Sequence, residues 1–230
     1  MARENSAVHR QSSGAPIEPG TVRRSLRAAA GVVLLGGLTF FAGVSRPVVT
    51  EWANAVDAKA DKARLIAIAL GNPSEFTLAW TLMGIGFILI GLGLGLWGWT
   101  VARLKTGGRA VAARVLGVTA AIGGFGSGLL RVIIPFVDLE RAAVGDSTLN
   151  IVFVPGALSL SLGYIGLGVL TWRGPAPRWV GIVLALIGLV AVVVPIPAWY
   201  MLGALVFGLV GVIHFRRSWP RKAYRPAPTT

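Results

Sequence analysis

Apart from Arg46 near the end of the first, Arg131 is the only charged residue inside the long apolar segments of this 230-residue chain. Its segment ends near Val137, about 9 Å further along a helix, and Asp138 follows on nearly the same helix face. At this depth an arginine is either a structural residue, which extends its guanidinium group to the membrane surface or pairs with Asp138, or an anion ligand. Arg131 and Asp138 are therefore a candidate site for a lipid head group or an anionic solute.

Residue patterns that would support catalysis, a metal or a cofactor are missing from the sequence. Without cysteine, the chain cannot form a disulfide, a thiolate nucleophile or a cysteine-ligated zinc or iron–sulfur centre. Its two histidines, His9 and His214, form no metal-binding motif, and neither matches the depth of the intramembrane hydroxyls of Ser159 and Ser161. The sequence predicts a protein that is not an enzyme and has no catalytic, cofactor-binding or metal-binding residues.

The composition is typical of a membrane protein. Hydrophobic residues make up 54% of the chain and charged residues 13%, whereas about a quarter of a soluble protein is charged. The mean hydropathy is +0.71. The 31 glycines are too many for ordinary soluble helices but suit transmembrane helices. These values exclude a soluble enzyme, a disordered chain and a disulfide-linked scaffold.

Six uniformly apolar segments approach or exceed the roughly 20 residues that a membrane-crossing helix needs. They predict an all-α integral membrane protein, a six-helix bundle over residues 21–217, with a tight turn at Pro195 and Pro197 between the last two spans. A cleaved signal peptide is the alternative for the first segment, but that segment is longer than a usual signal sequence. The predicted spans are about 28–49, 76–102, 115–137, 149–172, 179–194 and 198–215.

The charges predict the orientation of the bundle. The segments on the side of both termini carry sixteen basic and two acidic residues, and those on the opposite side carry five basic and seven acidic residues. By the positive-inside rule both termini are cytoplasmic, in a bacterial cytoplasmic (inner) membrane. The polar tails, 1–20 and 218–230, are expected to be disordered and to attract anionic lipids of the cytoplasmic face. No nucleic-acid-binding motif accompanies their charge.

The tryptophans lie at or near predicted span ends rather than in the middle of spans. Trp97 and Trp99 lie at a cytoplasmic end, Trp80 at an outer end, and Trp52 in an outer loop. This distribution predicts an aromatic belt at the two membrane interfaces, where the apolar ring is covered by lipid and the indole N–H meets water.

The one sizeable outer segment is predicted to contain a helix over about residues 51–70. Apolar residues spaced four and three apart share one face of it, so it would lie on the membrane or over the mouth of the bundle. This helix is expected to end near Gly71. Asn72 then caps the next helix, with Pro73 at its first position and Glu75 completing a capping box. A packed connector is favoured over a functional lid.

Small residues recur at four-residue spacing in several spans, and such stripes let helix backbones approach closely in lipid. Packing within the chain is their default interpretation, and a homodimer face is the alternative. The candidate helix-packing residues are Gly91, Gly95, Ala120, Gly124, Gly128, Ser159, Gly163, Ala204 and Gly208.

No motif identifies a family or a substrate. The sequence therefore supports a structural, accessory or interaction subunit, with membrane lipids and a protein in the membrane as its expected partners. The alternative is a small transporter or binding protein that takes an anionic lipid or small solute at Arg131.

Overall fold

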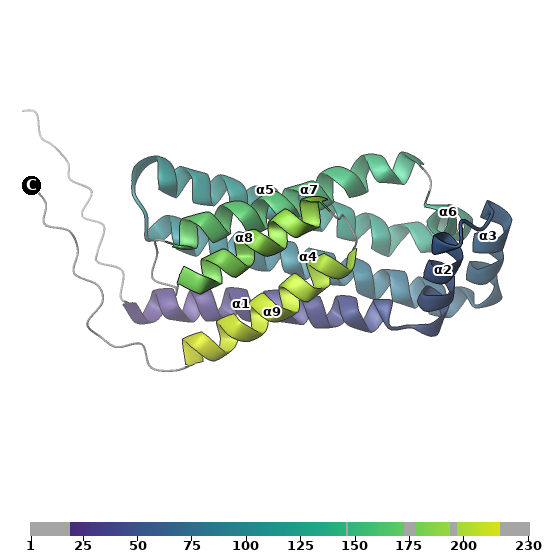
Figure 1. The fold of residues 1–230 in the computed structure, drawn as a ribbon, viewed down its shortest axis with the longest axis horizontal. Coiled ribbons are helices and arrows are strands. Elements are labelled where there is room, and N and C mark those ends of the chain that lie inside the picture. Colours follow the sequence, from purple (N-terminus) through teal and green to yellow (C-terminus); the bar gives the residue numbers. More distant parts are fainter. Residues whose placement is uncertain (1–18, 146, 173–177, 194–196, 217–230) are drawn as a thin grey trace, which may run out of the picture.

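The computed structural model describes residues 19–145, 147–172, 178–193 and 197–216. This part of the chain consists of helices joined by short turns and contains no strands (Figure 1), which confirms the predicted all-α class. Most of the predicted tails, 1–20 and 218–230, and most of the turn at 194–197 lie outside the described residues. The helices are α1 (Pro19–Val44), α2 (Pro47–Asp57), α3 (Lys62–Gly71), α4 (Pro73–Arg103), α5 (Gly107–Val137), α6 (Leu139–Val144), α7 (Ser147–Trp172), α8 (Arg178–Val193) and α9 (Pro197–Arg216).

Four of these helices, α1, α4, α5 and α7, are long and apolar enough to cross a membrane. They indicate a membrane protein. The apolar parts of α8 and α9 are shorter than the other four. The count of six spans and the orientation of the termini remain predictions.

The six longest helices form a closed ring. Along it, α1 contacts α4, α4 contacts α5, α5 contacts α7, α7 contacts α8, α8 contacts α9, and α9 returns to α1. The α4–α5 interface is the most extensive. The start of α1, the α4–α5 turn and the end of α9 lie at one end of the molecule, and the short helices α2, α3 and α6 gather at the other end (Figure 1).

The first predicted span is too long at its C-terminal end. We expected it to continue to residue 49, but α1 ends at Val44 and Pro47 starts α2. Proline has no backbone N–H and disfavours helical geometry in the residue before it, and Arg46 is accordingly extended, with φ −69° and ψ 138°. The proline therefore begins a new helix instead of prolonging α1.

The single outer helix predicted over 51–70 is also wrong. It is divided into α2 and α3 by a turn in which Lys59 has a positive φ of 53°. The carboxylate of Asp61 accepts a hydrogen bond from the backbone N–H of Arg64 at 2.9 Å and so caps α3. This local cap satisfies a free N–H at the start of a second helix, so one continuous apolar face does not form.

The predicted boundary between the outer segment and the next span is confirmed. α3 ends at Gly71, and Asn72 precedes Pro73 at the start of α4. The bond at this cap differs from a capping box, because the Asn72 side-chain amide donates to the Glu75 carboxylate at 2.9 Å and caps no backbone N–H.

Glycines on two faces of α4 bring its neighbours into backbone contact. Gly84, Gly91 and Gly98 face α5, and a Cβ atom added at Gly91 would lie only 2.8 Å from the carbonyl oxygen of Ala120. On the other face, Gly86 and Gly93 meet α1, where a Cβ at Gly86 would lie 2.8 Å from a backbone oxygen of that helix. Close backbone approach of this kind gives van der Waals attraction without a hydrophobic driving force.

Trp97 lies in the interior of the bundle, so its predicted place in the interfacial belt is wrong. It is fully buried, its ring centroid lies 4.8 Å from that of Phe207, and its indole N–H donates to the Thr171 hydroxyl at 3.1 Å. Trp99 is 48% exposed. Two residues along a helix turn the side chain by about 200°, which sends these neighbours to opposite sides of α4.

Candidate functional site

Arg131 lies between two aromatic rings from neighbouring helices. Its guanidinium carbon is 4.5 Å from the ring centroid of Phe87 on α4 and 4.0 Å from that of Phe153 on α7. A cation within about 6 Å of a ring face is attracted by the ring quadrupole, more strongly away from water. The partly buried side chain also donates to the carbonyl of Ser127 at 3.5 Å. Arg131 therefore points toward α4 and α7 inside the bundle.

The position of Arg131 follows from the face of α5 on which it lies. Gly124 contacts the α4 backbone, with Phe87 O 2.7 Å from a Cβ added there, and Arg131 follows seven residues later on nearly the same face. Four residues beyond, the buried Pro135 has no N–H to donate to the Arg131 carbonyl. The Arg131 side chain thus lies beyond the part of α5 where small residues such as Gly124 bring the helix against α4, and it packs beside the larger side chain of Phe87.

Asp138 pairs with Arg141, so the predicted pair of Arg131 with Asp138 does not form. Its carboxylate caps α6 by accepting from the backbone N–H of Arg141 at 2.9 Å, and it lies 3.9 Å from the Nε atom of the same residue. Asp138 terminates α5 and begins α6, so it acts in the turn beyond the span. The structure brings Arg131 to aromatic rings and Asp138 to Arg141.

An aromatic cluster joins the Arg131 site to the short helices at the end of the bundle. Trp80 lies near Phe153, with ring centroids 6.5 Å apart, and near Trp52 of α2, at 6.2 Å. The Trp52 indole N–H donates to the carbonyl of Ala143 on α6 at 2.7 Å. Phe87 and Phe153 were not predicted as neighbours of Arg131. No local signal relates three residues on three different spans.

The structure places all nine predicted packing residues at contacts between helices of the same chain. Gly91 meets Gly124 between α4 and α5, and Gly163 of α7 meets Ala120. On α9, Gly208 packs against the backbone of Leu34. Gly84 and Gly98 were not predicted, although their seven-residue spacing from Gly91 places all three glycines in one row along α4. The other predicted contacts are Gly95 with Ala121, Gly128 with Gly84, Ser159 with Gly123 and Ala204 with Gly37.

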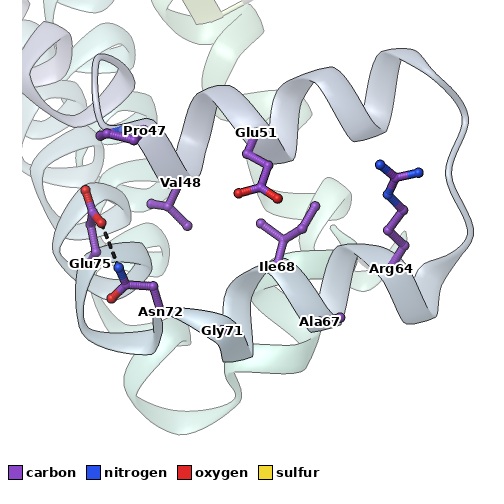
Figure 2. A pocket seen from close by; sticks show the side chains of 9 residues that line it. All are labelled: Pro47, Val48, Glu51, Arg64, Ala67, Ile68, Gly71, Asn72 and Glu75. Atoms are coloured by element: carbon purple, nitrogen blue, oxygen red, sulfur yellow. Dashed lines mark hydrogen bonds between the residues drawn. The ribbon is translucent and has the colours of Figure 1, made fainter.

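A hollow between α2 and α3 brings charged residues together. It has a volume of about 500 Å³, and Figure 2 shows Glu51 on α2 and Arg64 on α3 along its walls, with the hydrogen-bonded Asn72 and Glu75 at one side. Glu51 and Arg64 are exposed, so water weakens their electrostatic interaction with each other and with any ligand. Among the described residues, no cluster of three or more metal-ligating side chains occurs.

The chemistry open to the Arg131 site is anion binding and electrostatic stabilisation. A guanidinium group always carries its charge and donates hydrogen bonds in its own plane, and here its central carbon lies 4.5 and 4.0 Å from two phenylalanine ring centroids. Neither phenylalanine nor the Ser127 carbonyl can transfer a proton. The group therefore suits a ligand or structural role better than acid–base catalysis.

No protein-family model matches the chain. No curated protein and no solved structure matches it either.

Proposed function

We propose that this protein is a multi-pass bacterial inner-membrane protein without a catalytic centre, which acts as a structural, accessory or interaction subunit. The main support for this function is the packed interior of the bundle. Trp97, Tyr164 and Phe207 are fully buried there, and glycine backbones close the gaps between neighbouring helices. A bundle filled in this way leaves no wide interior path for a solute. Its rigid outer faces can contact lipid or another membrane protein.

The distribution of charge supports six spans with cytoplasmic termini. The acidic side chains of the described part all belong to the end with α2, α3 and α6, while the α4–α5 turn at the opposite end carries basic residues alone. α8 and α9 contain 16 and 20 residues, about 24 and 30 Å of helix. The length of each helix is therefore close to the thickness of the hydrocarbon core, about 30 Å.

Site-specific photocrosslinking in native membranes tests the proposal. A photoreactive amino acid is placed at Leu38 on α1, Ile122 on α5 or Leu189 on α8, which are 50%, 67% and 54% exposed and sample three helices of the ring. Ala120, fully buried on α5, is the matched control. We expect a discrete protein adduct from at least one exposed position and none from Ala120. Adducts to lipid alone from all three exposed positions would contradict a subunit role.

An anionic lipid or small solute bound at Arg131 is the second candidate function. It is favoured by the direction of the side chain, which points between α4 and α7 instead of toward surrounding lipid. Native mass spectrometry of the purified protein tests it. Retention of an anion by wild type, weaker retention by Arg131→Lys and none by a folded Arg131→Gln would support this function. An identical spectrum for all three would exclude it.

A further inference from the structure

The end of the bundle that holds the α4–α5 turn is strongly basic. Among residues whose side chains the structure describes, this end has eight arginines and lysines and no aspartate or glutamate. Glu4 and Glu18, which precede α1, are too few to balance this charge. The described side chains therefore give this end a net positive charge, which attracts anions. The eight cations are Arg23, Arg24, Arg27, Arg103, Lys105, Arg109, Arg114 and Arg178.

Trp99 marks the depth of this end relative to a membrane surface. Its ring lies 5.8 Å from the guanidinium carbon of Arg103 on the same helix and 5.4 Å from that of Arg114 on α5. The ring is 48% exposed and flanked by two exposed cations. An indole with this exposure and with charged neighbours belongs at the level of lipid head groups.

A hollow of about 550 Å³ lies at the α4–α5 turn, beyond Trp99 along the chain. Lys105 lines it from the turn and Arg109 from the first residues of α5, together with Leu104, Thr106 and Gly108. A Cβ atom added at Gly108 would meet nothing within 4 Å, so the space beside it is open. The hollow thus combines two cations, one hydroxyl and one apolar wall.

We propose that this hollow binds the phosphate head group of an anionic phospholipid. Lys105 and Arg109 contact the phosphate, and Trp99 holds the hairpin at head-group depth while Arg103 and Arg114 add to the positive field. An anionic lipid supplies both a negative charge for this basic end and acyl chains that cover the exposed apolar surface of α4 and α5. The lipid would belong to the cytoplasmic leaflet if the proposed orientation holds. The binding site is argued from the residues of the hollow and does not depend on that orientation. It is separate from the Arg131 site, which lies toward the opposite end of α5.

Lipid titration followed by native mass spectrometry tests the site. The full chain is purified in a neutral detergent and titrated with phosphatidylglycerol or with phosphatidylcholine, which has the same phosphate but no net charge. Each basic residue near a surface contributes about 1 kcal/mol to attraction of anionic lipid. We therefore expect phosphatidylglycerol binding to weaken about thirtyfold when Lys105→Gln and Arg109→Gln are combined.

The matched control combines Lys62→Gln and Arg64→Gln, which remove the same charge from exposed positions of α3 at the other end. This control should bind phosphatidylglycerol like wild type. Equal weakening of both paired variants, or equal binding of the two lipids by wild type, would overturn the proposal. If the Lys105 and Arg109 pair does not fold, Lys105→Gln alone should weaken binding about fivefold, and no change would overturn the site.

Inorganic phosphate separates a lipid from a free anion. Phosphate added without lipid should not raise the unfolding temperature of wild type, whereas phosphatidylglycerol should raise it. Equal stabilisation by both would overturn the lipid assignment. A failed lipid test would leave the photocrosslinking result unchanged, so the failure of the site and the failure of the subunit role are distinguishable.

Discussion

Gly124→Ala is the most direct test of the backbone contact between α4 and α5. In the structure, the new Cβ would lie 2.7 Å from the carbonyl oxygen of Phe87 and 2.8 Å from the Cα atom of Gly91. Both are backbone atoms, so a change of rotamer cannot relieve the clash. The helices must move apart until the shorter distance reaches ordinary contact, at 3.4 Å or more.

The expected loss of stability follows from that movement. A gap of 0.5–1 Å already removes about a quarter to a half of the dispersion attraction between facing atoms. Overpacking of a tight interface typically costs about 1–3 kcal/mol. Alanine has the higher helix propensity, by about 1 kcal/mol, which offsets part of this cost. We expect Gly124→Ala to lower the free energy of unfolding by up to about 2 kcal/mol relative to wild type, and by about 1–3 kcal/mol relative to an alanine placed at an uncrowded glycine of the same helix.

Gly126→Ala is the matched control on the same helix. A Cβ atom at Gly126 would meet nothing within 4 Å, so only the gain in helix propensity applies, and this variant should be as stable as wild type or more stable. Stability is measured by titration from mild detergent into dodecyl sulfate, with tryptophan fluorescence as the signal. Gly128→Ala, which faces the Gly84 carbonyl, should behave like Gly124→Ala. Equal midpoints for Gly124→Ala and Gly126→Ala would refute the proposed packing.

The other predictions concern a buried bond, a buried charge and the orientation. Trp97→Phe and Thr171→Val each remove one partner of a buried hydrogen bond, so each should lower stability by about 1–3 kcal/mol. In a double-mutant cycle the combined variant should lose less than the sum of the two. Arg131→Leu removes two cation–π contacts, worth about 0.5–2 kcal/mol each, but also a charge that costs about 2.5–3.5 kcal/mol at mid-span and less near the boundary. The two effects oppose each other, so the variant should be about as stable as wild type; a clearly lower unfolding temperature would show a stabilising role for the charge. A reporter active only in the cytoplasm should work when fused after Thr230 and be silent when inserted at Ala60; activity at Ala60 would reverse the orientation.

Several features of the fold could be predicted because they depend on local sequence. Membrane class follows from the length of apolar segments, since every backbone polar group in lipid must be satisfied within a helix. The boundary at Gly71 and Pro73 follows from residues whose own backbone preferences end one helix and start another. At Asp61 a local helix cap outweighed the continuous apolar periodicity over 51–70, so the prediction of one helix there was wrong.

Tertiary structure alone decided what surrounds each side chain. Trp97 and Trp99 have the same type and nearly the same depth, but one packs against Phe207 in the interior and the other lies exposed between two arginines. Which side of α4 faces the interior depends on the placement of its neighbours in the ring. The Arg131 site likewise combines side chains from α4, α5 and α7, and Asp138 is held by Arg141 in the following turn. Apolar length and charge are properties of a segment, whereas the partners of a residue are set by how separate helices pack against one another.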